Sequence, residues 1–78
     1  MARGDITEIY IELLDEGTPT LIGTTSIDLG NGTYKVLPSK RYDPEDQVWE
    51  FPPGTIVRGE YVKNGKMGTI FFAVAKVK

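Results

Sequence analysis

Hydrophobic and polar residues alternate along most of the chain with a period of two, which is typical of β-strands with one buried face. In the segment 6–14, the apolar residues from Ile9 to Leu13 occupy every second position and polar residues fall between them. The polar sequence DEGTP follows, in which Gly17 can adopt a positive φ angle and Pro19 restricts its neighbours. The pattern predicts a strand that ends in a turn.

A second alternating segment covers residues 21–29. Its residues fall into two sets of alternate positions, one on each face of the strand. The set that includes Thr24 and Ser26 is the more polar, and it is predicted to face solvent. The GNG sequence at 30–32 predicts a tight hairpin, since Asn and Gly accept the positive φ angles that such turns require. A short strand at 33–37 completes the predicted hairpin.

The C-terminal half contains two further strand patterns, at 48–51 and 55–63, on either side of a Pro-Pro-Gly sequence. Pro53 and Gly54 fit the two central positions of a type II turn. We therefore expect this turn to join two core strands as a hairpin.

Asn64 and Gly65 predict one more hairpin turn. The last strand pattern, at 67–77, is long, and Gly68 is a natural position for a bend in it. Both faces of this segment are apolar, which favours a rolled sheet over an open one.

The segment 38–47 interrupts the strand patterns. Asp43 followed by Pro44 resembles a helix start, with an acidic N-cap before a proline at the first helical position. Because strands are predicted close on both sides, we expect a single helical turn near 44–47.

These elements predict an all-β fold, a small antiparallel barrel of five to six strands resembling the Src-homology-3 type. The chain, at 78 residues, is long enough for one domain with a modest core, which we assign to 1–78. Closure of the sheet would also protect the strand edges that an open sheet of this size exposes.

The only tryptophan, Trp49, lies in the VWEF sequence at 48–51. It could belong to a docking surface or to the core. Glu50 must face water, so alternation directs Trp49 and Phe51 inward, and the core assignment is favoured.

The same alternation in 55–63 directs Val57 and Tyr61 inward. Gly59 shares their face, and its missing side chain is predicted to make room for Trp49.

Composition removes several kinds of chemistry. The chain has no cysteine and no histidine, which excludes thiol chemistry, the commonest general base and the commonest metal ligand. The net charge is −2, so the basic surface expected of a nucleic-acid-binding protein is missing. No apolar signal-like segment begins the sequence, and no apolar run could span a bilayer, so we expect a cytoplasmic protein.

No catalytic, metal or cofactor site is predicted. Asp43, Glu45 and Asp46 form a small acidic cluster, but it lacks the ligand spacing of a calcium loop and is explained by a capped turn. The paired carboxylates at 15–16 lie in a polar turn, where nothing would shift their pKa for acid–base catalysis.

One polar loop is a candidate surface for a protein partner, because aromatic residues and Arg are enriched at interaction hot spots. Its candidate residues are Lys40, Arg41, Tyr42, Asp43 and Glu45. The sequence thus predicts a small, non-enzymatic protein-interaction module. The alternative is a small barrel that binds nucleic acid, which the acidic composition disfavours. The partner and the oligomeric state stay open.

Three segments carry a resemblance to a known family: ELLDEGT (12–18), LGNGTYKVL (29–37) and YDPEDQVWEFPPGTIVRGE (42–60). Together they resemble a family of short, uncharacterised bacterial proteins with an LLDEGT element, a Trp-Arg-Pro-Val element and an acidic turn leading into EVWEFPPGxxVRCE. The resemblance covers most of the chain and implies no activity, since none is assigned to the family. The chain departs from the pattern at 21–24, where Trp-Arg-Pro-Val would fall, and at Gly59, where the family has Cys. If the Trp-Arg-Pro element is functional there, this protein has lost or altered that role.

Overall fold

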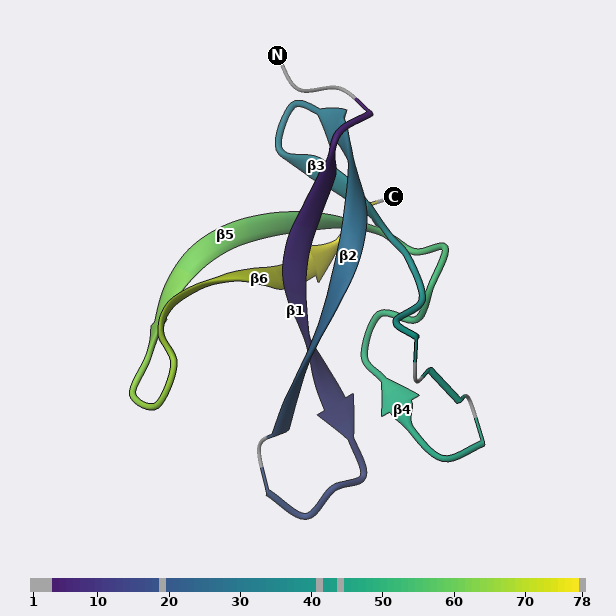
Figure 1. The fold of residues 1–78 in the computed structure, drawn as a ribbon, viewed down its shortest axis with the longest axis vertical. Coiled ribbons are helices and arrows are strands. Elements are labelled where there is room, and N and C mark those ends of the chain that lie inside the picture. Colours follow the sequence, from purple (N-terminus) through teal and green to yellow (C-terminus); the bar gives the residue numbers. More distant parts are fainter. Residues whose placement is uncertain (1–3, 19, 41, 44, 78) are drawn as a thin grey trace.

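The fold is all-β. The structure, a computed structural model, describes residues 4–18, 20–40, 42–43 and 45–77. Six strands form one sheet, and no helix occurs among the described residues. The strands are β1 (Ile6–Leu14), β2 (Thr20–Gly30), β3 (Thr33–Val36), β4 (Val48–Trp49), β5 (Ile56–Asn64) and β6 (Gly68–Lys76) (Figure 1).

The strand pairings close into a ring. β1 pairs with β2, β2 with β3, β3 with β5, β5 with β6, and β6 returns to β1. All of these pairs are antiparallel except β1–β6, which is parallel and rests on Tyr10 opposite Phe72. The short strand β4 lies outside the ring and pairs with the end of β1, with Trp49 opposite Leu13. The predicted strands are confirmed, but the sheet is mixed where an antiparallel one was expected.

The core contains the residues that alternation directs inward from β1, together with residues of the later strands. Its buried members are Ile9, Ile11, Leu13, Val36, Trp49, Phe51, Val57 and Ala73. The inward prediction for Trp49 and Phe51 is confirmed, and Glu50 between them is exposed. The Trp49 indole N–H donates a hydrogen bond to Gln47 Oε1 at 3.1 Å, so its polar atom is paired at the edge of the core.

The solvent face predicted for β2 is wrong. Thr24 and Ser26 are buried, with Ser26 fully inaccessible. Each hydroxyl donates to a backbone carbonyl: Thr24 Oγ1 to Leu37 O at 2.7 Å and Ser26 Oγ to Thr7 O at 3.0 Å. Small hydroxyl residues tolerate burial because these hydrogen bonds satisfy their polar atoms.

The inward prediction for Tyr61 is also wrong, although that for Val57 is confirmed: Tyr61 is 74% exposed and Val57 is fully buried. β3 pairs with β5 only as far as Arg58, so in the described part of the chain no strand pairs with this edge of β5 farther toward the hairpin tip. Figure 1 shows this hairpin as a curved ribbon that sweeps away from β1 and β2. Tyr61 lies in β5 beyond Arg58, toward the hairpin tip.

Gly59 makes room for an aromatic ring, but not for the predicted one. A Cβ atom at this position would overlap the ring of Phe71 on the neighbouring strand. Next to Gly59 the β5–β6 register shifts, because Arg58 lies opposite Ala75 and Gly59 opposite Ala73. The ring over Gly59 therefore comes from β6 and not from Trp49.

The Pro-Pro-Gly turn forms as predicted, but it joins no hairpin. Thr55 N donates to Pro52 O at 3.1 Å, and Gly54 has a φ angle of 95°, as a type II turn requires. The strands on either side do not pair with each other, since β4 pairs with β1 and β5 pairs with β3 and β6. Instead the turn contacts β3, because Gly54 N donates to Val36 O at 2.8 Å.

The other hairpin turns form where the sequence predicts them, with one difference in the β5–β6 hairpin. Gly17 and Asn31 adopt positive φ angles in the β1–β2 and β2–β3 hairpins, as predicted; Pro19 lies outside the described residues. In the β5–β6 hairpin the positive φ angle falls at Gly68, and Asn64 contributes through its side chain. Asn64 Oδ1 accepts hydrogen bonds from the backbone N–H groups of residues 66 and 67. The expected bend at Gly68 is therefore part of the turn.

The helical turn predicted near 44–47 is replaced by a hydrogen-bonded turn. Asp43 O accepts from Asp46 N at 3.0 Å and from Gln47 N at 2.9 Å. Asp43 Oδ1 accepts from Glu45 N at 2.9 Å, so the capping role predicted for Asp43 is present. Pro44 lies outside the described residues. The turn does not extend into a helix because β4 begins at Val48.

Candidate functional site

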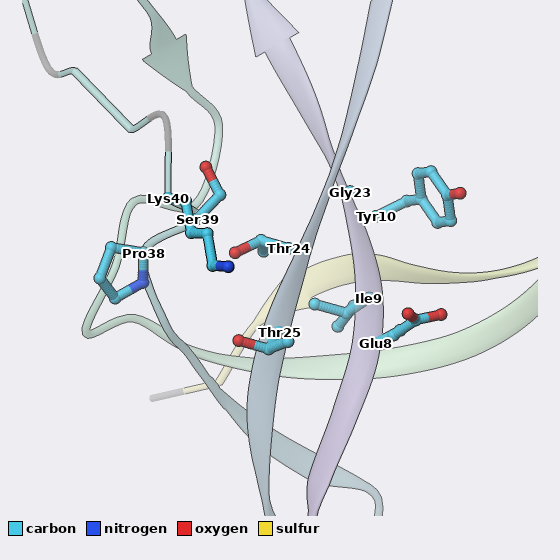
Figure 2. Close-up of a pocket in the computed structure, with 9 residues that line it drawn as sticks. All are labelled: Glu8, Ile9, Tyr10, Gly23, Thr24, Thr25, Pro38, Ser39 and Lys40. Carbon is cyan, nitrogen blue, oxygen red and sulfur yellow. The ribbon is translucent and has the colours of Figure 1, made fainter.

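A first groove lies between the edge of β2 and the segment that follows β3. It has a volume of about 430 Å³. Its lining residues are Glu8, Ile9, Tyr10, Gly23, Thr24, Thr25, Pro38, Ser39 and Lys40. Figure 2 shows Thr24, Ser39 and Lys40 on one side of the β1–β2 ribbon and Glu8 and Tyr10 on the other. This groove forms because the chain leaves the edge of β2 after Leu37, whose N–H still donates to Thr25 O at 2.9 Å.

The loop residues predicted to bind a partner are only partly brought together. Lys40 is exposed and lines the first groove. Tyr42 is half-buried and packs edge-on against Trp49, with ring centroids 4.7 Å apart, so it covers the core. Asp43 caps the turn, Glu45 is exposed, and Arg41 lies outside the described residues. A role in partner binding for these five residues stays a prediction.

A second groove, which the sequence did not predict, lies between β1 and the β5–β6 hairpin. Its volume is about 440 Å³. It is lined by Thr7, Glu8, Tyr10, Tyr61, Met67, Thr69, Ile70 and Phe71. Of the large apolar side chains that are exposed in the described residues, Tyr61 and Met67 line this groove and none lines the first.

An aromatic cluster supports one wall of the second groove. The Phe71 ring lies 4.9 Å from the rings of both Tyr34 and Tyr61, measured between centroids. Burial raises the pKa of the Tyr34 phenol, and the nearby Asp28 carboxylate and Tyr61 add to this effect. Gly59 permits the arrangement, because only a residue without Cβ leaves room for Phe71 above β5. Tyr61 of β5 and Phe71 of β6 therefore line this wall, and Tyr34 of β3 packs against Phe71.

One acidic side chain lines the β1 side of this groove, and two others lie farther along β1 and beside it. Of the described residues that line the groove, Glu8 alone is charged. Glu12 follows Glu8 on the same face of the strand, and Glu50 comes next to it, since Glu50 N donates to Glu12 O at 2.9 Å. Desolvation raises the pKa of the Glu50 carboxyl, and repulsion by Glu12 raises it further. Through Glu8 alone, the β1 side of the groove favours a cation.

The sequence did not predict the second groove, because strand alternation does not show where a hairpin extends beyond the strands that cover it. The length of the two C-terminal strand patterns was the available indication. A hairpin with nine residues in each strand reaches past β3, which has four. Its outermost inward-facing residues must then lie in solvent or against a partner.

Comparison with known proteins adds no relative: no protein-family model, curated protein or solved structure matches the chain. Within the described ranges, no group of three or more acidic side chains is arranged to hold a metal ion. No helix formed by the described residues is long and apolar enough to cross a membrane.

Proposed function

We propose that this protein is a small, non-enzymatic protein-interaction module, and that the second groove is its binding surface. The observation behind the proposal is that Tyr61 and Met67, 74% and 44% exposed, lie together in one groove beside Phe71. Aromatic residues and Met are enriched at protein interfaces, where their apolar area is removed from water on binding. An exposed Tyr and Met in a groove support a binding role better than a purely structural one.

The fold proposal accompanies the functional one. We propose that the ring of strand pairings is a small barrel resembling the Src-homology-3 type. Its closed order and short β3 support this assignment. Small barrels of this kind present grooves between their hairpins to extended segments of partner proteins. We also retain the proposed kinship with the short bacterial proteins that carry the LLDEGT and EVWEFPPG motifs, on the three segments that resemble them.

Site-specific photo-crosslinking tests the function. A photo-crosslinking phenylalanine derivative replaces Tyr61, whose exposure allows the change without disturbing the core. The same derivative replaces Lys40 in the first groove and, as a control, the exposed Lys35 of β3, which lines neither groove. After irradiation in cells that produce the protein, we expect a discrete protein adduct at position 61 and none at position 35.

Other outcomes change the assignment in defined ways. An adduct at position 40 and not at 61 would move the binding surface to the predicted loop and the first groove. Adducts that contain RNA or DNA would favour the nucleic-acid-binding alternative. Equal, diffuse labelling at all three positions would reject the interaction-module proposal.

A further inference from the structure

The strand β6 has a free edge beside the second groove. Along one edge it pairs with β5 from Gly68 to Lys76. Along the other edge it pairs with β1 at Phe72 only. The segment 68–71 of that edge therefore has no strand partner in the part of the chain that the structure describes. An unpaired edge presents backbone N–H and C=O groups that a further strand can bind.

We propose that an extended, basic peptide segment of a partner protein adds to this edge of β6 as a further strand. The inference rests on the proposed interaction function and specifies the conformation and charge of the partner. The free edge is long enough for about four residues, or roughly 13 Å of extended chain. Backbone hydrogen bonds to β6 would contribute affinity for any extended peptide, whatever its sequence. Contacts with side chains must therefore provide the selectivity.

Apolar selectivity comes from the walls of the groove. Side chains alternate along an added strand, so every second residue of the peptide faces the Tyr61, Met67 and Phe71 side. These three side chains come from the β5–β6 hairpin and line one groove. They favour an aliphatic or aromatic residue at those peptide positions.

Charge selectivity comes from β1. Among the described residues that line the groove, Glu8 alone is charged. Glu12 lies farther along β1, beside Glu50, and neither of these two lines the groove. A Lys or Arg of the peptide can pair with Glu8, whereas an acidic residue would be repelled. On the hairpin, the exposed cation Lys63 lies opposite Thr69, toward the tip. It supplies a matched test of the charge argument.

The test begins with a selection of random peptides displayed on phage against the whole chain. The enriched peptides are then synthesised and titrated into labelled protein, with amide chemical shifts as the readout. We expect enriched peptides to contain Lys or Arg between apolar residues, and to perturb Thr69, Ile70 and Phe71 most strongly. Methylation of alternate backbone nitrogens of the same peptide should abolish binding, because it removes the strand hydrogen bonds.

Two charge variants complete the test. E8Q should weaken binding of the selected peptides about fivefold, as expected for a partly exposed ion pair. K63Q should leave binding unchanged or strengthen it. Both residues are exposed, so neither change removes a core contact.

The inference is overturned if no peptide is enriched, if the enriched peptides are acidic, or if E8Q and backbone methylation have no effect. It is also overturned if the free chain dimerises through 68–71, with chemical shifts there that depend on protein concentration. A protein adduct at position 61 without any peptide binding would reject strand addition and leave the interaction function standing. If neither a protein adduct at position 61 nor peptide binding is found, strand addition and the interaction function are both rejected.

Discussion

At the scale of single residues, Gly59 is the position at which one missing side chain organises a cluster. Phe71 lies over it and contacts both Tyr34 and Tyr61. Any residue with a Cβ at this position would collide with the Phe71 ring as placed here. Gly59 and the position of Phe71 are thus coupled, and with them one wall of the second groove.

We predict that G59A lowers the free energy of unfolding by about 1–3 kcal/mol, because the new methyl group displaces a packed ring. G23A is the matched control: a Cβ there would lie 3.4 Å from Tyr10 Cε2, an ordinary contact distance. Urea denaturation followed by circular dichroism measures both variants. Equal stability of G59A and G23A would show that Phe71 moves without cost.

Whether a side chain is buried or exposed was predictable where every second residue of a strand is clearly apolar, as for Ile9 and Ile11 of β1 and for Trp49. It was not predictable for Thr24 and Ser26, because a hydroxyl is stable either in water or against a backbone carbonyl. Only the positions of Leu37 O and Thr7 O, which belong to other segments, decide between the two.

At the scale of elements, the turns set the path of the chain. The Pro-Pro-Gly turn links the short strand β4 to β5 and reaches β3 through the hydrogen bond from Gly54 N to Val36 O. Its type was predictable from its own residues, since Pro and Gly suit the two central positions. Its partners were not, because strand pairing depends on residues far away in the sequence.

G54A should lower the free energy of unfolding by about 1–2 kcal/mol, since a residue with a Cβ is strained at its φ angle of 95°. G65A is the control in another turn, where φ is outside the left-handed region and an added Cβ would meet no atom within 4 Å. Thermal unfolding of the two variants compares them. A destabilisation of G65A as large as that of G54A would argue against φ strain as the cause.

At the scale of the whole molecule, charge is unevenly distributed. Glu8 and Glu12 lie along β1, and Glu50, which follows β4, is hydrogen-bonded to Glu12, while Lys63 and Lys66 lie at the far end of the β5–β6 hairpin. The composition alone, with a net charge of −2, did not indicate this separation. The six strands were predictable from local patterns, but the ring order and the second groove depend on how the hairpins meet.

The acidic side leads to a pH prediction. Desolvation first, and then repulsion by Glu12, raise the pKa of Glu50 above its ordinary value of 4.5 in the folded state. The folded protein therefore holds this proton more tightly than the unfolded chain, and ionisation of Glu50 opposes folding. The contribution of Glu50 to stability falls as pH rises from 4.5 through the raised pKa.

E50Q should therefore be more stable than the wild type at neutral pH, and the difference should shrink as pH falls below 4.5. E12Q should give a smaller gain in the same direction, because it removes only the second cause. Unfolding free energies measured across this pH range provide the comparison. A gain from E50Q that persists unchanged in acid would show that the effect is not electrostatic.

The closure of the ring by Tyr10 and Phe72 also has a consequence for folding kinetics. These residues lie near opposite ends of the chain. Bringing them together costs more loop-closure entropy than forming a hairpin, so their contact is expected to form late. The hairpins β1–β2 and β5–β6 join neighbouring segments and can form earlier. Until β1 pairs with β6, the apolar segment 70–75 lies at an open strand edge, where it can pair with another nascent chain. The rate of this one closing step, and not only the final stability, then sets how much of the protein aggregates as it folds.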